Sequence, residues 1–296
     1  MNAKPYLQKL SPRVRILLVL VTLGVIALVA FLLLVPPGLQ VTFIDVGRGG
    51  NVGDSILFQT TEGKVMLIDG GEPNTGALEY LQAHGIDHID IVLLTHHHQD
   101  HYGGLTDVLR SIPVDLVITN GDDKDEPLYL EFKAALQASG AKTRVVKSGD
   151  KISLGRLTFH VLSPRKLNPS STNNNSIVMR LPVGRVVFLF TGDMMELEEG
   201  RLIAARAPLK ATILKIAHHA ADTSSTGAFL TEVKPKLAIY SVGVGNIHGF
   251  PHQSTLDDLA AVGAEVYGTD EYGTIVVHTD GWSYDLTTER DDVVLP

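Results

Sequence analysis

The sequence of 296 residues contains no cysteine. Disulfide bonds, thiolate metal ligands and a cysteine nucleophile are therefore excluded, and the absence fits either side of a membrane. Low-complexity sequence is also scarce. Apart from the polar tract 170–175, the composition is globular, with 44% hydrophobic and 20% charged residues. A chain of this length can bury a sizeable core and form one large or two small domains.

Acidic residues are missing from the N-terminal part of the chain, where none precedes Asp45. The apolar run 16–35 carries no charge, and it follows four basic residues: Lys4, Lys9, Arg13 and Arg15. Such a run is long enough to span a bilayer as a helix. A cleaved signal peptide is the alternative, but its apolar region is normally shorter, and no Ala-x-Ala site precedes Pro36.

The positive-inside rule then gives the organisation of the chain. We expect a cytoplasmic basic tail (1–15), a single-pass transmembrane signal anchor (16–35), a Pro-Pro-Gly linker (36–38) and one domain (39–296) outside the cell membrane. The chain has 25 Lys and Arg, four of them in the tail, against 33 Asp and Glu, so the exported part has a net charge near −12. This charge disfavours DNA binding on average without excluding a short cationic cleft.

The most informative segment is 95–101, with the sequence Thr-His-His-His-Gln-Asp-His. It follows the apolar run 89–94, which predicts a core strand, and the next helix is expected near 105–110. Imidazole and carboxylate groups are ligands of Zn²⁺ and related ions. The candidate ligands in this segment are His96, His98, Asp100 and His101. Their alternation allows His96 and His98 to converge on one ion while Asp100 and His101 face a second, which a histidine-rich surface turn would not explain.

A glycine-rich loop at 46–54 is a second candidate site, for phosphate. The dinucleotide-binding pattern needs Gly-x-Gly-x-x-Gly at the start of a helix. Here Val52 stands at the position of the third glycine, and a strand is predicted after the loop. The sequence therefore predicts no nucleotide site in this loop.

Thr-His-x-His-x-Asp-His after an apolar strand resembles the metallo-β-lactamase superfamily. Further motifs are similar to the hydrolase domain of ComEC/Rec2-type DNA-uptake proteins: Gly53-Asp54-Ser55, Asn174-Asn175-Ser176, Ala217-His218-His219-Ala220 and Pro251-His252. The resemblance implies an αββα sandwich over residues 39–296, with two mixed sheets face to face and helices outside. The alternation of predicted strands and helices independently favours α/β layers.

The resemblance also implies a set of site residues. The metal ligands would be His96, His98, Asp100, His101, Asp193 and His219, the last favoured over His218. Asp193, at the end of the apolar strand 186–190, would bridge two ions, and Asp69 would orient a metal-bound histidine. Asp100, His218 and His252 would take part in catalysis, with His252 binding or protonating the leaving group. The implied cofactor is Zn²⁺, one or two ions, with Mn²⁺ as an alternative.

The chain departs from this pattern at several positions. Many superfamily members have a ligating histidine near the tract before Ser176, whereas this chain offers only His160, inside a strand pattern. One ligand of the first metal is therefore expected to be missing or replaced by an amide oxygen. Ala220 and Phe250 stand where relatives have glycine and histidine.

The implied function is that of a membrane-anchored extracytoplasmic hydrolase, a phosphodiesterase or nuclease acting through a metal-bound hydroxide. The alternatives are a lactonase, a β-lactamase-type hydrolase, a phosphocholine esterase, or a non-catalytic surface binding or assembly protein. Expected partners are a phosphodiester substrate, DNA among the candidates, or a small molecule, and the membrane through the N-terminal helix. Because such relatives couple this domain to a many-helix channel, a role in DNA transport would require a separate channel protein.

Overall fold

The computed structural model describes the backbone of residues 11–34 and 38–290, and the side chains of residues 11–26 and 38–290. The chain divides after Pro36 into two compact units, each described by itself. The first contains helix α2 (Pro12–Leu34). Within the described residues, no helix combines the length and the hydropathy that crossing a membrane requires. Residues 1–10 of the predicted tail and 35–37 of the predicted anchor and linker lie outside the described residues, and the membrane anchor stays a prediction.

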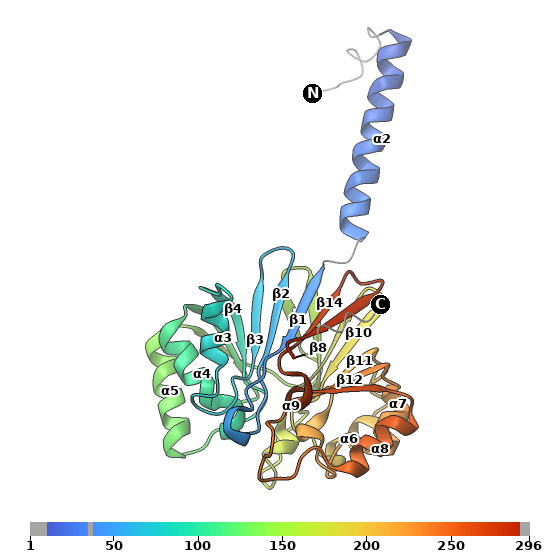
Figure 1. Cartoon of the computed structure of the whole chain (residues 1–296). Coiled ribbons are helices and arrows are strands. Elements are labelled where there is room, and N and C mark those ends of the chain that lie inside the picture. Colours follow the sequence, from blue (N-terminus) through green and yellow to red (C-terminus); the bar gives the residue numbers. More distant parts are fainter. Residues whose placement is uncertain (1–10, 35–37, 291–296) are drawn as a thin grey trace. The chain divides into compact units, whose positions relative to one another are not determined.

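The second unit is built on two β-sheets (Figure 1). The eight strands of the first sheet are, in spatial order, β15 (Tyr284–Thr288), β14 (Ile275–Thr279), β1 (Leu39–Phe43), β2 (Ile56–Thr60), β3 (Val65–Ile68), β4 (Ile89–Leu93), β5 (Val114–Thr119) and β6 (Lys142–Val145). The seven strands of the second are β13 (Glu265–Gly268), β12 (Leu237–Tyr240), β11 (Ile213–Lys215), β10 (Val186–Phe190), β9 (Val178–Val183), β8 (Leu157–Ser163) and β7 (Lys151–Leu154).

Both sheets are mixed in direction. Strands β3 to β6 run parallel, as do β10 to β13, whereas the other neighbours are antiparallel. Parallel neighbours need crossover connections, which are usually helices. The helices that follow the first-sheet strands are α3 (Ala77–Ala83), α4 (Gln99–Ser111) and α5 (Pro127–Ser139), and those of the second half are α6 (Glu196–Ala204), α7 (Gly227–Val233) and α8 (Gln253–Ala261).

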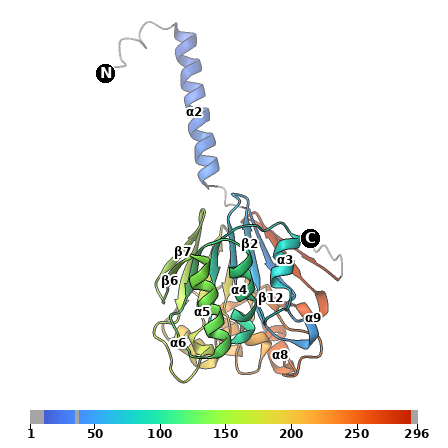
Figure 2. The ribbon, with the colours of Figure 1, turned by 90° about the vertical axis from the view of Figure 1, so that its left-hand side faces the viewer.

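The helices cover the outer faces of the two sheets, α3 to α5 on one side and α6 to α8 on the other (Figures 1 and 2). Alternate residues of each strand divide the core into layers. In β4, Ile91 and Leu93 belong to the cluster between the sheets, whereas Val92 between them packs under the helices. The sheets meet through aromatic rings, because Phe58 of β2 contacts Phe159 of β8 edge-on with ring centroids 5.3 Å apart. The predicted αββα sandwich is confirmed.

The parallel strands place functional side chains at one end of the sandwich. Asp69 follows β3, the segment 94–98 follows β4, Asp193 follows β10, and the short 3₁₀ turn η3 (Ala217–Ala220) follows β11. One boundary differs from the sequence prediction, because α4 begins at Gln99 rather than near 105. Asp100 and His101 therefore lie in the first turn of a helix, where the backbone fixes their direction.

Candidate metal centre

The segment after β4 directs its histidines alternately. His96 and His98 approach each other, with Nε2 of His96 3.1 Å from Nδ1 of His98. The side chain between them, His97, points elsewhere and places Nδ1 3.3 Å from Asp122 Oδ2. The backbone bends at His96 and His97 and becomes extended at His98, just before the helix. Gln99 then starts α4, and its first turn brings His101 Nε2 to 3.5 Å from Asp100 Oδ2.

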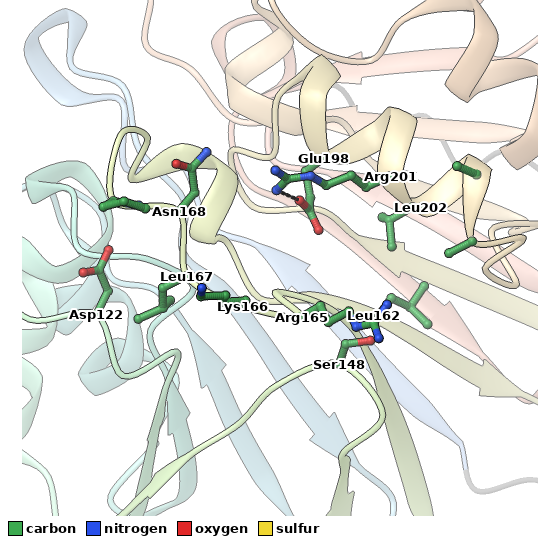
Figure 3. Close-up of a pocket in the computed structure, with 13 residues that line it drawn as sticks. Asp122, Ser148, Leu162, Arg165, Lys166, Leu167, Asn168, Glu198, Arg201 and Leu202 are labelled. Atoms are coloured by element: carbon green, nitrogen blue, oxygen red, sulfur yellow. Dashed lines mark hydrogen bonds and ion pairs between the residues drawn. The ribbon is translucent and has the colours of Figure 1, made fainter.

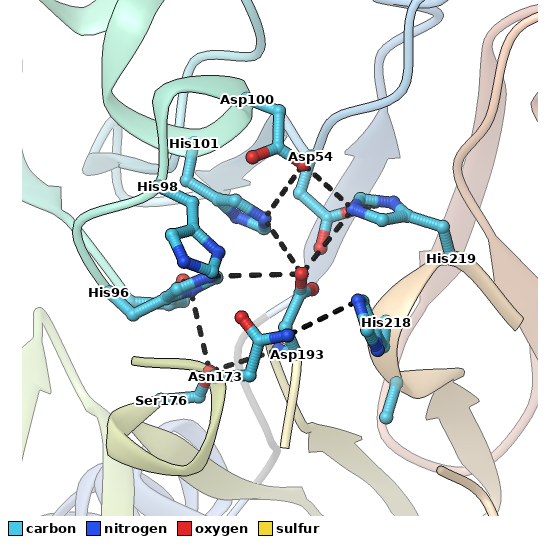
Figure 4. A network of polar contacts seen from close by, with 12 residues as sticks. Asp54, His96, His98, Asp100, His101, Asn173, Ser176, Asp193, His218 and His219 are labelled. Carbon is cyan, nitrogen blue, oxygen red and sulfur yellow. Dashed lines mark hydrogen bonds and ion pairs between the residues drawn. The ribbon is translucent and has the colours of Figure 1, made fainter. Parts of the chain in front are cut away.

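Asp193 lies at the centre of the cluster (Figure 4). Its Oδ2 atom is 3.3 Å from His101 Nε2, 3.5 Å from His219 Nε2 and 3.7 Å from His96 Nε2. Its backbone N–H donates to Ser176 Oγ over 3.0 Å. The preceding Gly192 has φ +50°, and a Cβ there would lie 2.9 Å from Ser176 Cβ. Glycine is therefore required for the turn that brings Asp193 into the site.

His219 reaches the cluster from an unusual turn. His218, His219 and Ala220 have φ values of +50°, +55° and +64°. Positive φ at residues other than glycine costs roughly 1–3 kcal/mol each and is concentrated at functional sites. Ala220 thus adopts the left-handed conformation that glycine would adopt more easily. The turn places His219 Nε2 3.1 Å from Asp100 Oδ2, as well as close to Asp193.

Two histidines of the cluster, His219 and His101, are oriented by hydrogen bonds to groups outside it. In each ring the bond is made by Nδ1, so that Nε2 faces the cluster. His219 Nδ1–H donates to the Ser241 carbonyl oxygen over 2.9 Å, and His101 Nδ1–H donates to Asp69 Oδ2 over 2.8 Å. Asp69 is itself held, because it accepts the backbone N–H of Thr95 over 2.8 Å. When the ring is neutral, each Nε2 atom therefore presents its lone pair to the cluster, which is the tautomer that ligates a metal.

The pKa values of several residues in the cluster differ strongly from their ordinary values. Burial disfavours the charged form of His101, but the carboxylates of Asp193, Asp100 and Asp69 outweigh it and raise the pKa well above its ordinary value. Burial is likewise outweighed at His219, whose pKa rises to about 10 beside Asp193 and Asp100. Burial alone would raise the pKa of Asp193, but His101 and His219 hold it well below its ordinary value. The buried carboxylate of Asp193 thus stays ionised and requires positive charge nearby.

These residues fit divalent metal ions. One group, His96, His98 and Asp193, and another, Asp100, His101, Asp193 and His219, each place their ligand atoms within 4.8 Å of one another. The two groups share Asp193. Its second oxygen, Oδ1, is buried and makes no hydrogen bond within the described part of the chain. Imidazole nitrogen and carboxylate oxygen are the ligand types that Zn²⁺ and Mn²⁺ accept, so the donor set could hold one or two such ions.

The tract before Ser176 contributes an amide where the sequence resemblance predicts a histidine. The 3₁₀ turn η2 (Asn173–Asn175) places Asn173 Nδ2 3.2 Å from His218 Nε2. Asn173 Oδ1 is buried and has no hydrogen-bond partner among the described residues. Ser176 Oγ lies 3.4 Å from His96 Nδ1. Amide and hydroxyl groups therefore face this side of the cluster, and His160 lies on strand β8.

Two predicted catalytic residues lie outside the ligand groups. His218 is directed to Asn173 and Thr223, with Nδ1 3.1 Å from Thr223 Oγ1. His252 Nδ1 accepts the backbone N–H of Asp222 over 2.9 Å. The ring of Phe250 contacts the rings of both His219 and His252, with centroids 6.3 Å and 5.2 Å away. His218 therefore borders the cluster directly, whereas His252 borders it across Phe250.

Sequence reasoning missed a buried ion pair behind His219. Lys215 Nζ is 2.7 Å from Asp54 Oδ2, and both side chains are almost completely buried. The other oxygen of Asp54 is 3.8 Å from His219 Nδ1. A lysine at the end of the apolar strand β11 was the available signal, since a buried ammonium needs a carboxylate partner. The pair ties the glycine-rich loop to the strand that carries the histidine turn.

The αββα sandwich and the cluster of histidines and aspartates at one end of it can be compared with known protein families. The sequence profile described as "Metallo-beta-lactamase superfamily" matches residues 48–244. The chain belongs to this superfamily. Among solved structures, the metallo-beta-lactamase fold protein YhfI from Bacillus subtilis has a TM-score of 0.55 at 17% identity and covers 82% of this chain and 100% of its own. That likeness concerns the fold alone.

Within the superfamily, the chain is similar to competence proteins. ComE operon protein 3 of Bacillus subtilis is 31% identical over an alignment of 277 residues that covers 86% of this chain and 35% of that protein. Competence protein ComA of Neisseria gonorrhoeae is 29% identical over an alignment of 239 residues that covers 79% of this chain and 31% of that protein. The chain thus spans about a third of the length of these curated relatives.

Replacing Asp69 with Asn should weaken metal binding by roughly 10- to 100-fold. The new amide can donate to His101 Nδ1, which moves the ring proton to Nε2 and removes the lone pair that faces the cluster. Competition with a chelator measures the affinity. Asp285→Asn, at a carboxylate with 55% side-chain exposure outside the candidate ligand groups, is the matched control and should bind metal like the wild type. Equal affinities in both variants would show that Asp69 does not orient His101 for a metal.

Proposed function

We propose that the chain is a metal-dependent phosphodiesterase whose substrate is nucleic acid. The single observation that carries the proposal is the cluster around Asp193, in which one buried carboxylate is shared by two groups of candidate ligands. Carboxylate-bridged pairs of metal ions recur in enzymes that cleave phosphate esters. Similarity to competence proteins supports nucleic acid over lactones and β-lactams as the substrate class.

The residues divide into roles by position. His96, His98 and Asp193 would hold one ion, and Asp100, His101, His219 and Asp193 the second. When bound, a divalent ion supplies a Lewis acid and lowers the pKa of a coordinated water toward neutrality. Asp69 and the Ser241 carbonyl keep the ligand tautomers. Asn173 and His218, which face each other at the edge of the cluster, are positioned to contact the phosphate oxygens of a substrate.

His252 would act on the leaving group. Because Nδ1 accepts the backbone N–H of Asp222, the ring proton resides on Nε2. This N–H would donate a hydrogen bond to the departing oxygen if substrate lies over Phe250, whose ring stands between His252 and the cluster. The side chain of His252 is 32% exposed, so a substrate can reach it.

Loaded with Zn²⁺ or Mn²⁺, the full chain should hydrolyse bis(p-nitrophenyl) phosphate and a single-stranded oligonucleotide faster than nitrocefin or a simple lactone. Asp193→Asn removes the shared charge while keeping the shape, and should lower kcat/KM by about 100-fold or more. Asp115→Asn is the control and should retain activity, because Asp115 pairs with His88 in a separate cluster. Faster turnover of nitrocefin or lactone than of both phosphodiesters would contradict the proposal.

We also propose a cellular location for the enzyme. Residues 16–35 would cross the cell membrane once, with the basic tail in the cytoplasm and the metal centre outside. The uncharged apolar sequence of this segment and the four basic residues before it support this arrangement. A channel protein would be a separate partner if the chain serves DNA transport.

Alkaline phosphatase fused after Pro296 should be active in cells, because this enzyme needs an oxidising, extracytoplasmic compartment. A green fluorescent protein fused at the same point should be dark when exported unfolded. Replacing the four basic tail residues with Glu should shift the balance toward the opposite orientation. An inactive phosphatase fusion together with a fluorescent one would place the domain in the cytoplasm.

A further inference from the structure

The loop between β8 and β9 links a basic segment to the metal centre. Arg165 and Lys166 follow the end of β8, and Asn173 and Ser176, at the other end of the same loop, face the cluster. The buried Asn175 anchors the middle of the loop, because its Oδ1 accepts the backbone N–H of Asn168 over 2.6 Å. Cations at the start of this loop and site residues at its end thus belong to one segment of the chain.

A cavity of about 1100 Å³ adjoins this loop (Figure 3). Leu162, Leu167 and Leu202 contribute apolar lining, and Arg165 and Lys166 line it as well. Asp122 and Asn168 also line the cavity, and both contact Asn175. Asp122 in addition contacts His97, which stands between His96 and His98. This side of the cavity therefore abuts the segments that build the metal centre.

A second cavity of about 330 Å³ shares two of these cations. Arg165 and Lys166 line it too, together with Lys147. We call Lys147, Arg165 and Lys166 the basic ridge. The Arg165 and Lys166 side chains are exposed, and neither forms an ion pair or a hydrogen bond within the part of the chain that the structure describes. The acid in this cavity, Asp150, uses Oδ2 to accept the backbone N–H of Lys147.

Other cations that line cavities have acidic residues beside them. Arg201, in the larger cavity, pairs with Glu198 over 2.9 Å. Another hollow contains Arg185 and Lys236, but also Glu265 and Asp285. The net charge after the basic tail is near −12, so two cations without an acidic partner beside these cavities differ from the average charge of the domain. Such a feature points to a polyanionic ligand.

We propose that the basic ridge binds the phosphate backbone of a single nucleic-acid strand whose cleaved phosphodiester lies in the metal centre. The inference rests on the proposed function and names where the rest of the substrate lies. Lysine and arginine bind phosphates of a strand by releasing its condensed counterions. The apolar side chains of the larger cavity would contact unstacked bases, which a duplex does not offer. Because the domain is acidic on average, a polyanionic strand would favour the basic ridge over the rest of the surface.

The test compares two variants of the full chain that lose the same charge. Arg165→Gln/Lys166→Gln removes two cations of the ridge. Lys210→Gln/Lys236→Gln removes two exposed cations that precede β11 and β12, at the opposite end of these strands from the metal centre. The probe is a fluorescent phosphorothioate oligonucleotide of about 20 thymidines, which spans more than one binding site of typical size. Fluorescence anisotropy gives the affinity over a series of salt concentrations, and bis(p-nitrophenyl) phosphate hydrolysis is measured in parallel.

The ridge variant should bind the oligonucleotide roughly tenfold more weakly at low salt, and the slope of log affinity against log salt should fall by about 1.4, two contacts at about 0.7 each. The control variant should match the wild type, and all three proteins should hydrolyse the small ester equally. Equal affinities and slopes for the two variants would overturn the proposal. So would a ridge variant that loses binding to phosphatidylglycerol vesicles but not to the oligonucleotide. If the wild type leaves the small ester intact, the proposed function fails while the binding comparison still stands.

Discussion

The structure of the site depends on one buried carboxylate. Asp193 lies within 3.7 Å of imidazole nitrogens from His96, His101 and His219, which come from both halves of the sandwich. An ionised carboxylate in a buried environment is costly unless positive charge or hydrogen bonds compensate it. Here the compensating groups are histidines whose tautomers are fixed from behind by Asp69 and the Ser241 carbonyl. Metal ions in the same place would provide the compensation more fully than protons do.

Several unfavourable backbone conformations are needed to build this arrangement. Gly192 is needed where a side chain would collide with Ser176, and the turn after β11 holds His218, His219 and Ala220 at positive φ. Strained backbone of this kind persists only where the surroundings determine it. The Lys215–Asp54 ion pair supplies part of that support, because it joins the strand before the turn to the glycine-rich loop. Breaking one partner of a buried pair is far more destabilising than a surface change.

Much of the fold followed from apolar runs between turn residues. The run 89–94 predicted β4 because both faces of that strand are buried, and strand β10 was predicted with the bounds observed. Strand β7, strand β15 and helix α6 were missed, because each is short and half polar in sequence. The predicted ligands do converge, but their contacts depend on pairing between distant strands. The Lys215–Asp54 pair was not predicted, because its two residues lie far apart in the sequence. The basic ridge was not predicted either, because the sequence does not show which cations lack an acidic partner in the folded chain.

The central claim is that Asp193 is shared by two metal ions. Elemental analysis of the metal-reconstituted full chain, beside the Asp193→Ala variant, tests it most directly. The account predicts about two ions per chain in the wild type and one or fewer in the variant, because both ligand groups lose their common member. One ion or none in the wild type, unchanged by the substitution, would contradict it. That result would mean that the amide and hydroxyl groups of Asn173 and Ser176 do not replace a missing histidine, and that the cluster is not a dinuclear centre.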